Sequence, residues 1–204
     1  MSSTHTVFVV DDDPAVRDSL KFMLESAGHH VEAYGSAGEM VDRAGRPVAG
    51  CLVADVRLPG MSGLDLIDKL NEAGTDLPVI VITGHGDVDA AVRALKSGAV
   101  DFIQKPFSNQ SLLDRIVQAL ETDRQHRDSC RERAEICERF ERLTPREKQV
   151  MAMVVEGKLN KQVAADLKLS PKTIEVHRSH AMTKMGASSF ADLVRMAVIL
   201  GEGC

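Results

Sequence analysis

Short strand-like segments, separated by helical ones, constrain this sequence more than any other feature. The wholly apolar runs are residues 7–10, 51–54 and 79–82, and two further strand-like segments are residues 30–34 and 100–104. The segments between them have helical periodicity, and glycines such as Gly28 and Gly98 end them. Continuous apolar strands that alternate with helices predict a parallel sheet covered on both faces. We therefore expect an α/β, doubly wound domain with a five-stranded parallel sheet, whose ligands bind beyond the carboxyl ends of the strands.

The charge of the chain is unevenly distributed and divides it into parts. Residues 1–107 carry 16 Asp and Glu against 9 Lys and Arg, whereas residues 142–204 carry 6 against 10. An apolar stripe that ends at Leu120 can still pack on the sheet. We therefore predict the α/β domain over residues 1–120, a linker over residues 121–141 and a basic domain over residues 142–204. The basic domain is the candidate for binding nucleic acid.

Residues 121–141 are highly charged and carry only scattered apolar side chains. This composition favours a solvated helical linker. A coiled-coil dimer seam is the alternative, although Asp123 and Arg127 interrupt its apolar heptad. Both interpretations remain open from the sequence.

The basic domain has helix signals only. Thr144 and Glu147 have the spacing of a capping box with Pro145 at the first helical position, and Ser170 precedes Pro171 in the same way. Gly157 and Gly186 end two of the expected helices, and Asn160 can cap a third. Four short helices with tight turns predict an all-α domain that contains a helix-turn-helix.

Polar residues stand at the carboxyl ends of the predicted strands: Asp11 and Asp12, Asp55, Thr83 and Lys105. The carboxyl ends of parallel strands share one edge of the sheet, so these groups can converge. Three carboxylates repel one another unless a cation neutralises them, and oxygen ligands favour Mg²⁺. Asp55 can then attack phosphorus, while the metal and Lys105 stabilise the charge on the transferring group. Each aspartate alone would be interpreted as a helix cap.

Residues 6–120 resemble a CheY-like receiver domain. The motifs that carry the resemblance are Val10-Asp11-Asp12-Asp13, Asp55-Val56-Arg57-Leu58-Pro59-Gly60-Met61-Ser62-Gly63, Thr83-Gly84-His85-Gly86-Asp87 and Lys105-Pro106-Phe107. The resemblance implies the flavodoxin-like strand order 2-1-3-4-5 and makes Asp55 the phosphoacceptor.

The same resemblance implies roles for the neighbouring groups. Asp12 and Asp55 would bind Mg²⁺ together with the backbone carbonyl of Arg57, and Asp11 would hold the ion through water. Thr83 and Lys105 would contact the phosphoryl group. Phe102 would be a rotating aromatic switch, although it also fits an ordinary core phenylalanine.

The segment from Pro171 to Met185 has the two faces of a helix that reads DNA. Its apolar positions Ile174, Ala181, Met182 and Met185 are expected to pack inward. Its polar and charged positions can reach base edges, and nearby lysines can contact phosphates. The expected DNA-binding residues are Lys161, Lys172, Thr173, Glu175, Val176, Arg178, Ser179 and Lys184.

This domain closely resembles the LuxR-type helix-turn-helix. The motifs are Leu143-Thr144-Pro145-Arg146-Glu147, Asn160-Lys161-Gln162-Val163-Ala164, Ser170-Pro171-Lys172-Thr173-Ile174-Glu175-Val176-His177-Arg178 and Lys184-Met185-Gly186. With the receiver in front, the chain resembles the FixJ/NarL class of response regulators. His180 departs from the pattern, because relatives often carry Asn there.

The resemblance implies a transcription factor controlled by phosphorylation and not an enzyme, although a receiver catalyses its own phosphotransfer and slow dephosphorylation. Its expected partners are a sensor histidine kinase, promoter DNA, RNA polymerase and, when phosphorylated, a second copy of the chain. The sequence has no G-x-x-x-x-G-K-[ST] motif, no close cysteine pair and no membrane-length apolar run, which favours a cytoplasmic protein that does not use ATP itself.

Two alternatives come from other classes of protein. A phosphatase of the haloacid dehalogenase type also uses an aspartate at a strand end. It needs a second aspartate two residues later, where Arg57 stands. A helical domain that binds protein instead of DNA is the other alternative.

Overall fold

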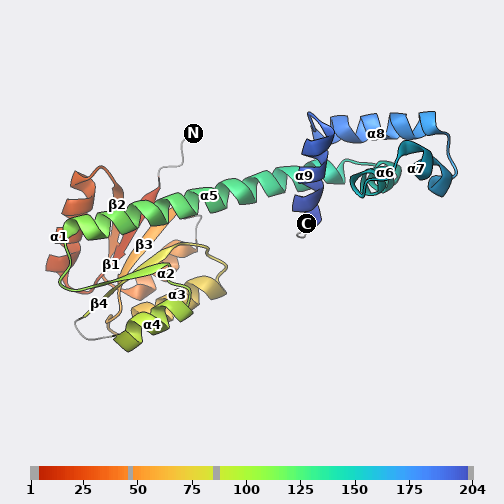
Figure 1. Ribbon diagram of the computed structural model, residues 1–204. Helices are drawn as coiled ribbons and strands as arrows, with labels where there is room; N and C mark the ends of the chain where they lie inside the picture. Colours follow the sequence, from red (N-terminus) through yellow and green to blue (C-terminus); the bar gives the residue numbers. More distant parts are fainter. Residues whose placement is uncertain (1–4, 46–47, 85–87, 202–204) are drawn as a thin grey trace. The chain divides into compact units, whose positions relative to one another are not determined.

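The computed structural model describes residues 5–45, 48–84 and 88–201, and the chain divides into two compact units, Met1–His126 and Arg127–Cys204. Among the described residues of the first unit, five strands form a parallel sheet in the order β2-β1-β3-β4-β5 (Figure 1). The strands are β1 (Thr6–Val10), β2 (His30–Tyr34), β3 (Gly50–Asp55), β4 (Val79–Thr83) and β5 (Asp101–Gln104). The fold class and the strand order expected from the sequence are confirmed.

Helices cover both faces of this sheet, as its apolar strands require. Alternate residues of β1 face opposite ways, so Val7 and Val9 enter one hydrophobic core and Phe8 and Val10 enter the other. The first face is covered by α1 (Pro14–Ser26) and the start of α5 (Asn109–Glu141), and the second by α2 (Ala37–Ala44), α3 (Gly63–Glu72) and α4 (Val88–Lys96) (Figure 1). Each large apolar side chain that is fully buried, such as Phe8, stabilises the unit by about 1.5–3 kcal/mol.

The register of the strands aligns their carboxyl ends. Val10 of β1 lies opposite Ala54 of β3, so the next residues, Asp11 and Asp55, emerge side by side. On the other side of β3, Thr83 is the last residue of β4, and its carbonyl accepts a hydrogen bond from the backbone N–H of Lys105 at 2.9 Å. The polar residues therefore converge because pairing fixes where each strand ends.

Helix α5 is continuous over 33 residues and is packed at both ends of its charged part. The Asp123 side chain is buried and accepts a hydrogen bond from the backbone N–H of Gly50 at 2.9 Å. Ile136 is 2% exposed and belongs to the core of the second unit. The segment 121–141 is thus helical but not solvated throughout. Asp123 is buried because it accepts the hydrogen bond of the Gly50 N–H, and Ile136 is buried because it is part of the second core.

The second unit contains α6 (Pro145–Val155), α7 (Asn160–Leu167), α8 (Pro171–Met185) and α9 (Phe190–Gly201). The Glu147 side chain accepts from the backbone N–H of Thr144 at 2.8 Å, and the Thr144 hydroxyl accepts from the N–H of Glu147 at 3.3 Å. The expectation that Asn160 caps α7 is wrong. Leu159 is the cap residue, and its N–H donates to Oε1 of Gln162 at 2.8 Å. The helical domain predicted from the sequence is confirmed.

Candidate functional site

The carboxyl edge of the first unit brings three charged side chains together. Asp11 follows β1, Asp55 ends β3 and Lys105 follows β5. The ammonium of Lys105 donates a hydrogen bond to Oδ2 of Asp55 and lies 3.5 Å from Oδ2 of Asp11. The Asp11 side chain is 3% exposed and that of Asp55 is 13% exposed, so two nearly buried carboxylates share one cation.

Lys105 offsets part of the negative charge of the two aspartates at this edge. Burial raises the pKa of Asp11, and the neighbouring charge of Asp55 raises it further, although the N–H of Asp13 and the charge of Lys105 act in the opposite direction. Burial alone would lower the pKa of Lys105, but its bonds and charge interactions with both aspartates outweigh burial and raise it. The edge therefore carries excess negative charge that favours binding of a further positive group.

Backbone groups hold both carboxylates in place. The N–H of Arg57 donates to Oδ1 of Asp55 at 2.8 Å, and the N–H of Asp13 donates to Oδ1 of Asp11 at 2.9 Å. One oxygen of each carboxylate is thus fixed by the backbone, and the other faces Lys105. This arrangement orients Asp55 without a further side chain.

Two supporting residues escaped the sequence reasoning. Arg17 of α1 donates from Nη1 to the backbone carbonyl of Asp11 at 2.7 Å. A Cβ at Gly63 would lie 2.2 Å from the backbone carbonyl oxygen of Asp55, so only glycine lets the following loop return to β3. Gly63 stood within a recognised motif, whereas Arg17 had no signal beyond its place on the first helix.

The remaining residues expected at the edge are less closely gathered. Asp12, two residues beyond the end of β1, is exposed. Thr83 is 2% exposed, and Phe102 is partly buried against the core that contains Phe8. The loop residues 85–87, part of the expected motif after Thr83, lie outside the described residues.

The donor groups fit a hard cation better than a soft one. Within the described ranges, no three Asp, Glu, His or Cys side chains are gathered closely enough to hold a metal ion. Of the three expected carboxylates, Asp11 and Asp55 both contact Lys105, whereas Asp12 is exposed. Carboxylate and backbone carbonyl oxygens are nevertheless the donors that Mg²⁺ prefers, and it needs only one or two carboxylates.

The second candidate region is the outer face of α8. Its buried side chains are Ile174, Ala181 and Met185, while Met182 is partly buried. Lys172, Glu175, Val176 and Ser179 are exposed and Thr173 is partly exposed, and Lys161 is exposed on α7. The division into an inner and an outer face therefore follows the pattern expected from the sequence.

Two of the expected DNA-binding residues have partners within the unit. The guanidinium of Arg178 lies 4.9 Å from the centre of the Phe190 ring and donates to Oδ1 of Asn160 at 3.4 Å. The ammonium of Lys184 donates to Oε2 of Glu147 at 2.7 Å. Sequence reasoning could not identify these pairs, because their members come from different helices.

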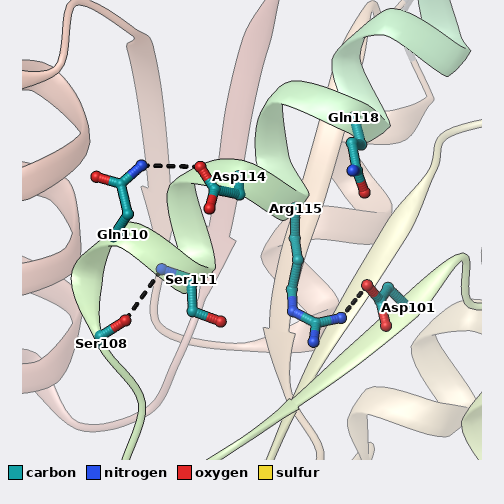
Figure 2. Close-up of a pocket in the computed structure, with 7 residues that line it drawn as sticks. All are labelled: Asp101, Ser108, Gln110, Ser111, Asp114, Arg115 and Gln118. Atoms are coloured by element: carbon teal, nitrogen blue, oxygen red, sulfur yellow. Dashed lines mark hydrogen bonds and ion pairs between the residues drawn. The ribbon is translucent and has the colours of Figure 1, made fainter.

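A polar hollow between β5 and α5 is separate from the carboxyl edge (Figure 2). Its lining residues are Asp101, Ser108, Gln110, Ser111, Asp114, Arg115 and Gln118. Figure 2 shows Arg115 extending from α5 to pair with Asp101, and Gln110 bonded to Asp114 at 2.8 Å. The charged groups of the hollow, Asp101, Asp114 and Arg115, are thus already paired, so we assign no ligand to it.

No helix among the described residues is long and apolar enough to cross a membrane. Comparison with protein families gives two matches that together span most of the chain. Residues 7–117 match the response regulator receiver domain, and residues 141–197 match the bacterial regulatory proteins of the luxR family. The first match contains the carboxyl edge, and the second contains α6 to α8 and most of α9.

Individual relatives match over nearly the whole length. Nodulation protein W of Bradyrhizobium diazoefficiens is 50% identical over 98% of this chain and 88% of its own length. The transcriptional regulatory protein FixJ of Azorhizobium caulinodans is 46% identical over 98% of this chain and 95% of its own length. The solved structure of the response regulator StyR is 40% identical, with a TM-score of 0.85 over 96% of this chain and 99% of its own.

A solved structure of full-length FixJ from B. japonicum is also 40% identical and covers all of both chains, with a TM-score of 0.62. Each of these relatives is aligned over both the receiver and the LuxR-type segments of this chain. The chain belongs to the transcriptional response regulators that join a receiver domain to a LuxR-type DNA-binding domain.

Proposed function

We propose that Asp55 accepts a phosphoryl group from a sensor histidine kinase. One observation carries this proposal: Asp55 has one oxygen fixed by the N–H of Arg57 and the other beside the ammonium of Lys105. An oxygen of Asp55 forms the new bond to phosphorus, and the bond from phosphorus to the donor nitrogen breaks. Lys105 then neutralises charge on the phosphoryl oxygens.

Mg²⁺ is the proposed cofactor of this transfer. Asp12, Asp55 and the carbonyl of Arg57 would hold it directly, and Asp11 would hold it through water. The ion supplies positive charge to the transferring group. The excess negative charge between Asp11 and Asp55 supports the proposal, since a second cation relieves the repulsion that Lys105 only partly offsets. Slow hydrolysis of the phosphorylated Asp55 by water would return the receiver to its resting state.

Phosphorylation would be transmitted through Thr83 and Phe102. The added phosphoryl group carries about −1.5 to −2 charges and attracts the Thr83 hydroxyl, which gives Phe102 space to turn inward. The surface over residues 88–105 would change and form a dimer. Exposed Val92, Leu95 and Val100 on this surface support the proposal, because a dimer would cover them.

The helical unit would bind promoter DNA through the outer face of α8 and recruit RNA polymerase. Glu175, Val176 and Ser179 would read base edges, and Lys161 and Lys172 would contact phosphates. We also propose a cytoplasmic location, where kinase and promoter are both accessible. The functional boundaries would be residues 1–120 for the receiver, 121–141 for the linker and 142–204 for the DNA-binding domain.

The test compares Asp55→Asn with the matched variant Asp18→Asn, which changes an exposed aspartate on α1. Beryllofluoride and Mg²⁺ are added to each protein, and its mass is measured by analytical ultracentrifugation. We expect dimers for the wild type and for Asp18→Asn, and monomers for Asp55→Asn. A dimer of Asp55→Asn that still depends on beryllofluoride would overturn the proposal.

A further inference from the structure

Glu147 is a buried carboxylate that stands outside every set of residues assigned to DNA so far. Its side chain is 4% exposed, although it lies in the first turn of α6. It accepts hydrogen bonds from the N–H of Thr144 at 2.8 Å and from the ammonium of Lys184 at 2.7 Å. A ring nitrogen of His180 lies 3.8 Å from its other oxygen. Two of these three groups belong to α8.

The charge of Glu147 is strongly stabilised where it is. Burial alone would raise its pKa, but the hydrogen bonds from Lys184 and Thr144 lower it to about 2. The carboxylate is therefore ionised at neutral pH, and its partner on α8 must remain in place. A buried ion pair loses much of its stability when one member is removed, because the other charge stays uncompensated.

The carboxyl end of α8 is held from a second direction. Arg139 of α5 donates from Nη1 to the backbone carbonyl of Met185 at 3.4 Å. A Cβ at Gly186, whose φ is 70°, would approach the same guanidinium to 3.2 Å. Charged groups from α5 and α6 thus meet the last turn of α8, while the residues proposed to read bases lie nearer its start.

These contacts bear on the role of Lys184. Its ammonium already has a buried partner, and a move to a DNA phosphate would leave Glu147 unpaired in a position that water scarcely reaches. Lys184 is itself exposed on α8, as are Lys172 on α8 and Lys161 on α7, so its bond to the buried Glu147 and not its own burial sets it apart. A basic side chain near DNA can therefore act beneath the recognition helix instead of on the phosphate backbone.

We propose that Glu147 and Lys184 are positioning residues for DNA reading, which fix α8 against α6, and that Lys184 acts through Glu147 and not on a phosphate. The inference rests on the proposed DNA contacts of α8. It assigns Glu147 a part in sequence reading that a helix cap alone would not have.

The salt dependence of DNA affinity separates the two roles of Lys184. Each neutralised phosphate contributes about −0.9 to the slope of log K against log salt, whereas a positioning residue contributes nothing to it. The probe is the duplex most enriched by the full-length wild type, with beryllofluoride, from a random library of about 30 base pairs, long enough for two half-sites. Affinity is measured by fluorescence anisotropy over a series of KCl concentrations.

We expect Lys184→Met and Glu147→Gln each to weaken binding to this duplex by about tenfold or more, because each leaves a charge unpaired or a helix loosely held. Neither variant changes the slope. The double variant is no weaker than the worse single variant, since both break one interaction. Lys184→Arg, which keeps the pair, restores most of the affinity.

Lys172→Met is the matched control and is expected to reduce the slope by about 0.9. A smaller slope for Lys184→Met, with additive losses in the double variant, would overturn the positioning role. An unchanged slope for Lys172→Met would instead overturn the proposed phosphate contact of Lys172, while the coupling between positions 147 and 184 would still decide the present inference.

A measurement on the wild-type protein covers the case in which Glu147→Gln does not fold. The ammonium resonance of Lys184 is followed by ¹⁵N NMR during titration with the same duplex. A resonance that stays at its free position supports the pair with Glu147. A resonance that shifts and gains a correlation to a ³¹P nucleus overturns it.

Discussion

Asp55 in the receiver is held by its own neighbours, whereas the side chains of α8 that we assign to DNA extend into solvent. The N–H of Arg57 and the ammonium of Lys105 fix both oxygens of Asp55. Val176, in contrast, is 47% exposed on α8. In the helical unit the fixed group lies underneath, where Glu147 joins α6 to α8. In the receiver, hydrogen bonds thus fix the reacting side chain itself. In the helical unit, they fix the helix that carries the exposed side chains.

The two regions should therefore tolerate amino-acid substitutions differently. A site whose reacting group is part of a bonded network must keep its network, and changes around it should affect chemistry and stability together. A helix that presents exposed side chains can change them with little effect on folding, provided that its support remains.

Gly63→Ala should destabilise the receiver by about 2–4 kcal/mol, because the new methyl group collides with the Asp55 carbonyl. Urea unfolding can be followed by tyrosine fluorescence, since Tyr34 is the only tyrosine, there is no tryptophan, and Tyr34 lies in β2. Phosphorylation of Asp55 by acetyl phosphate should slow as well. Gly38→Ala in α2, whose added Cβ would meet only the Ser36 hydroxyl oxygen at an unstrained 4.0 Å, is the control and should leave the unfolding midpoint unchanged or slightly higher.

Glu147→Gln should destabilise the helical unit by about 2–3 kcal/mol at pH 7, because the pKa of Glu147 is lowered from 4.5 to about 2. A lowered pKa contributes stability above pH 4.5 that disappears as the pH falls toward 2. Wild type and variant should therefore converge in acid. Hydrogen exchange of amides in α6 and α8 measures this, with exposed Glu156→Gln as control. An equal difference at pH 2 and pH 7 would contradict the assignment.

Asp11→Asn should stabilise the receiver by about 1 kcal/mol at pH 7, while it impairs phosphorylation. Burial, together with the charge of Asp55, raises the pKa of Asp11, so its ionised form costs folding stability that its protonated form does not. The gain should shrink as the pH falls and Asp11 in the wild type becomes protonated. Urea unfolding followed by Tyr34 fluorescence at pH 7 and pH 3 measures it, and a loss of stability at pH 7 would show that the bond to Lys105 dominates instead.

Arg195→Gln should leave the stability of the helical unit nearly unchanged, because exposed ion pairs contribute little. Arg195 bonds Glu132 at 2.5 Å, but both side chains are 51% exposed, and water competes for both. Thermal unfolding by far-ultraviolet circular dichroism, side by side with Glu147→Gln, compares a pair whose two members are exposed with a pair whose carboxylate is buried. Equal effects of the two variants would remove the contrast on which the comparison depends.

The receiver site was predictable from the sequence because its residues stand where strands end. Periodicity located those ends, and parallel pairing then brought Asp11 and Asp55 side by side. The exposure of Asp12 was not predictable in this way. It depends on the local backbone after β1, and the N–H of Asp13 selects Asp11 as its acceptor.

In the helical unit, periodicity predicted the faces of α8 but not the partners of its charges. Glu147 and Lys184 are 37 residues apart, and Arg178 packs on Phe190 of another helix. No local pattern encodes such pairs, since both members also fit an ordinary solvated face. The burial of Asp123 escaped for the same reason, because its partner is a backbone N–H 73 residues away.

That contact between Asp123 and Gly50 has a consequence for how sequences of this kind can diverge. A side chain at position 50, where φ is 142°, would bring its Cβ to 1.8 Å from the carbonyl oxygen of Thr6, and loss of the carboxylate at position 123 would remove the acceptor of the Gly50 N–H. Neither position can drift alone without a cost in stability. Two independent requirements thus meet at one backbone residue: Thr6 excludes a side chain at position 50, and the N–H there needs the carboxylate of Asp123.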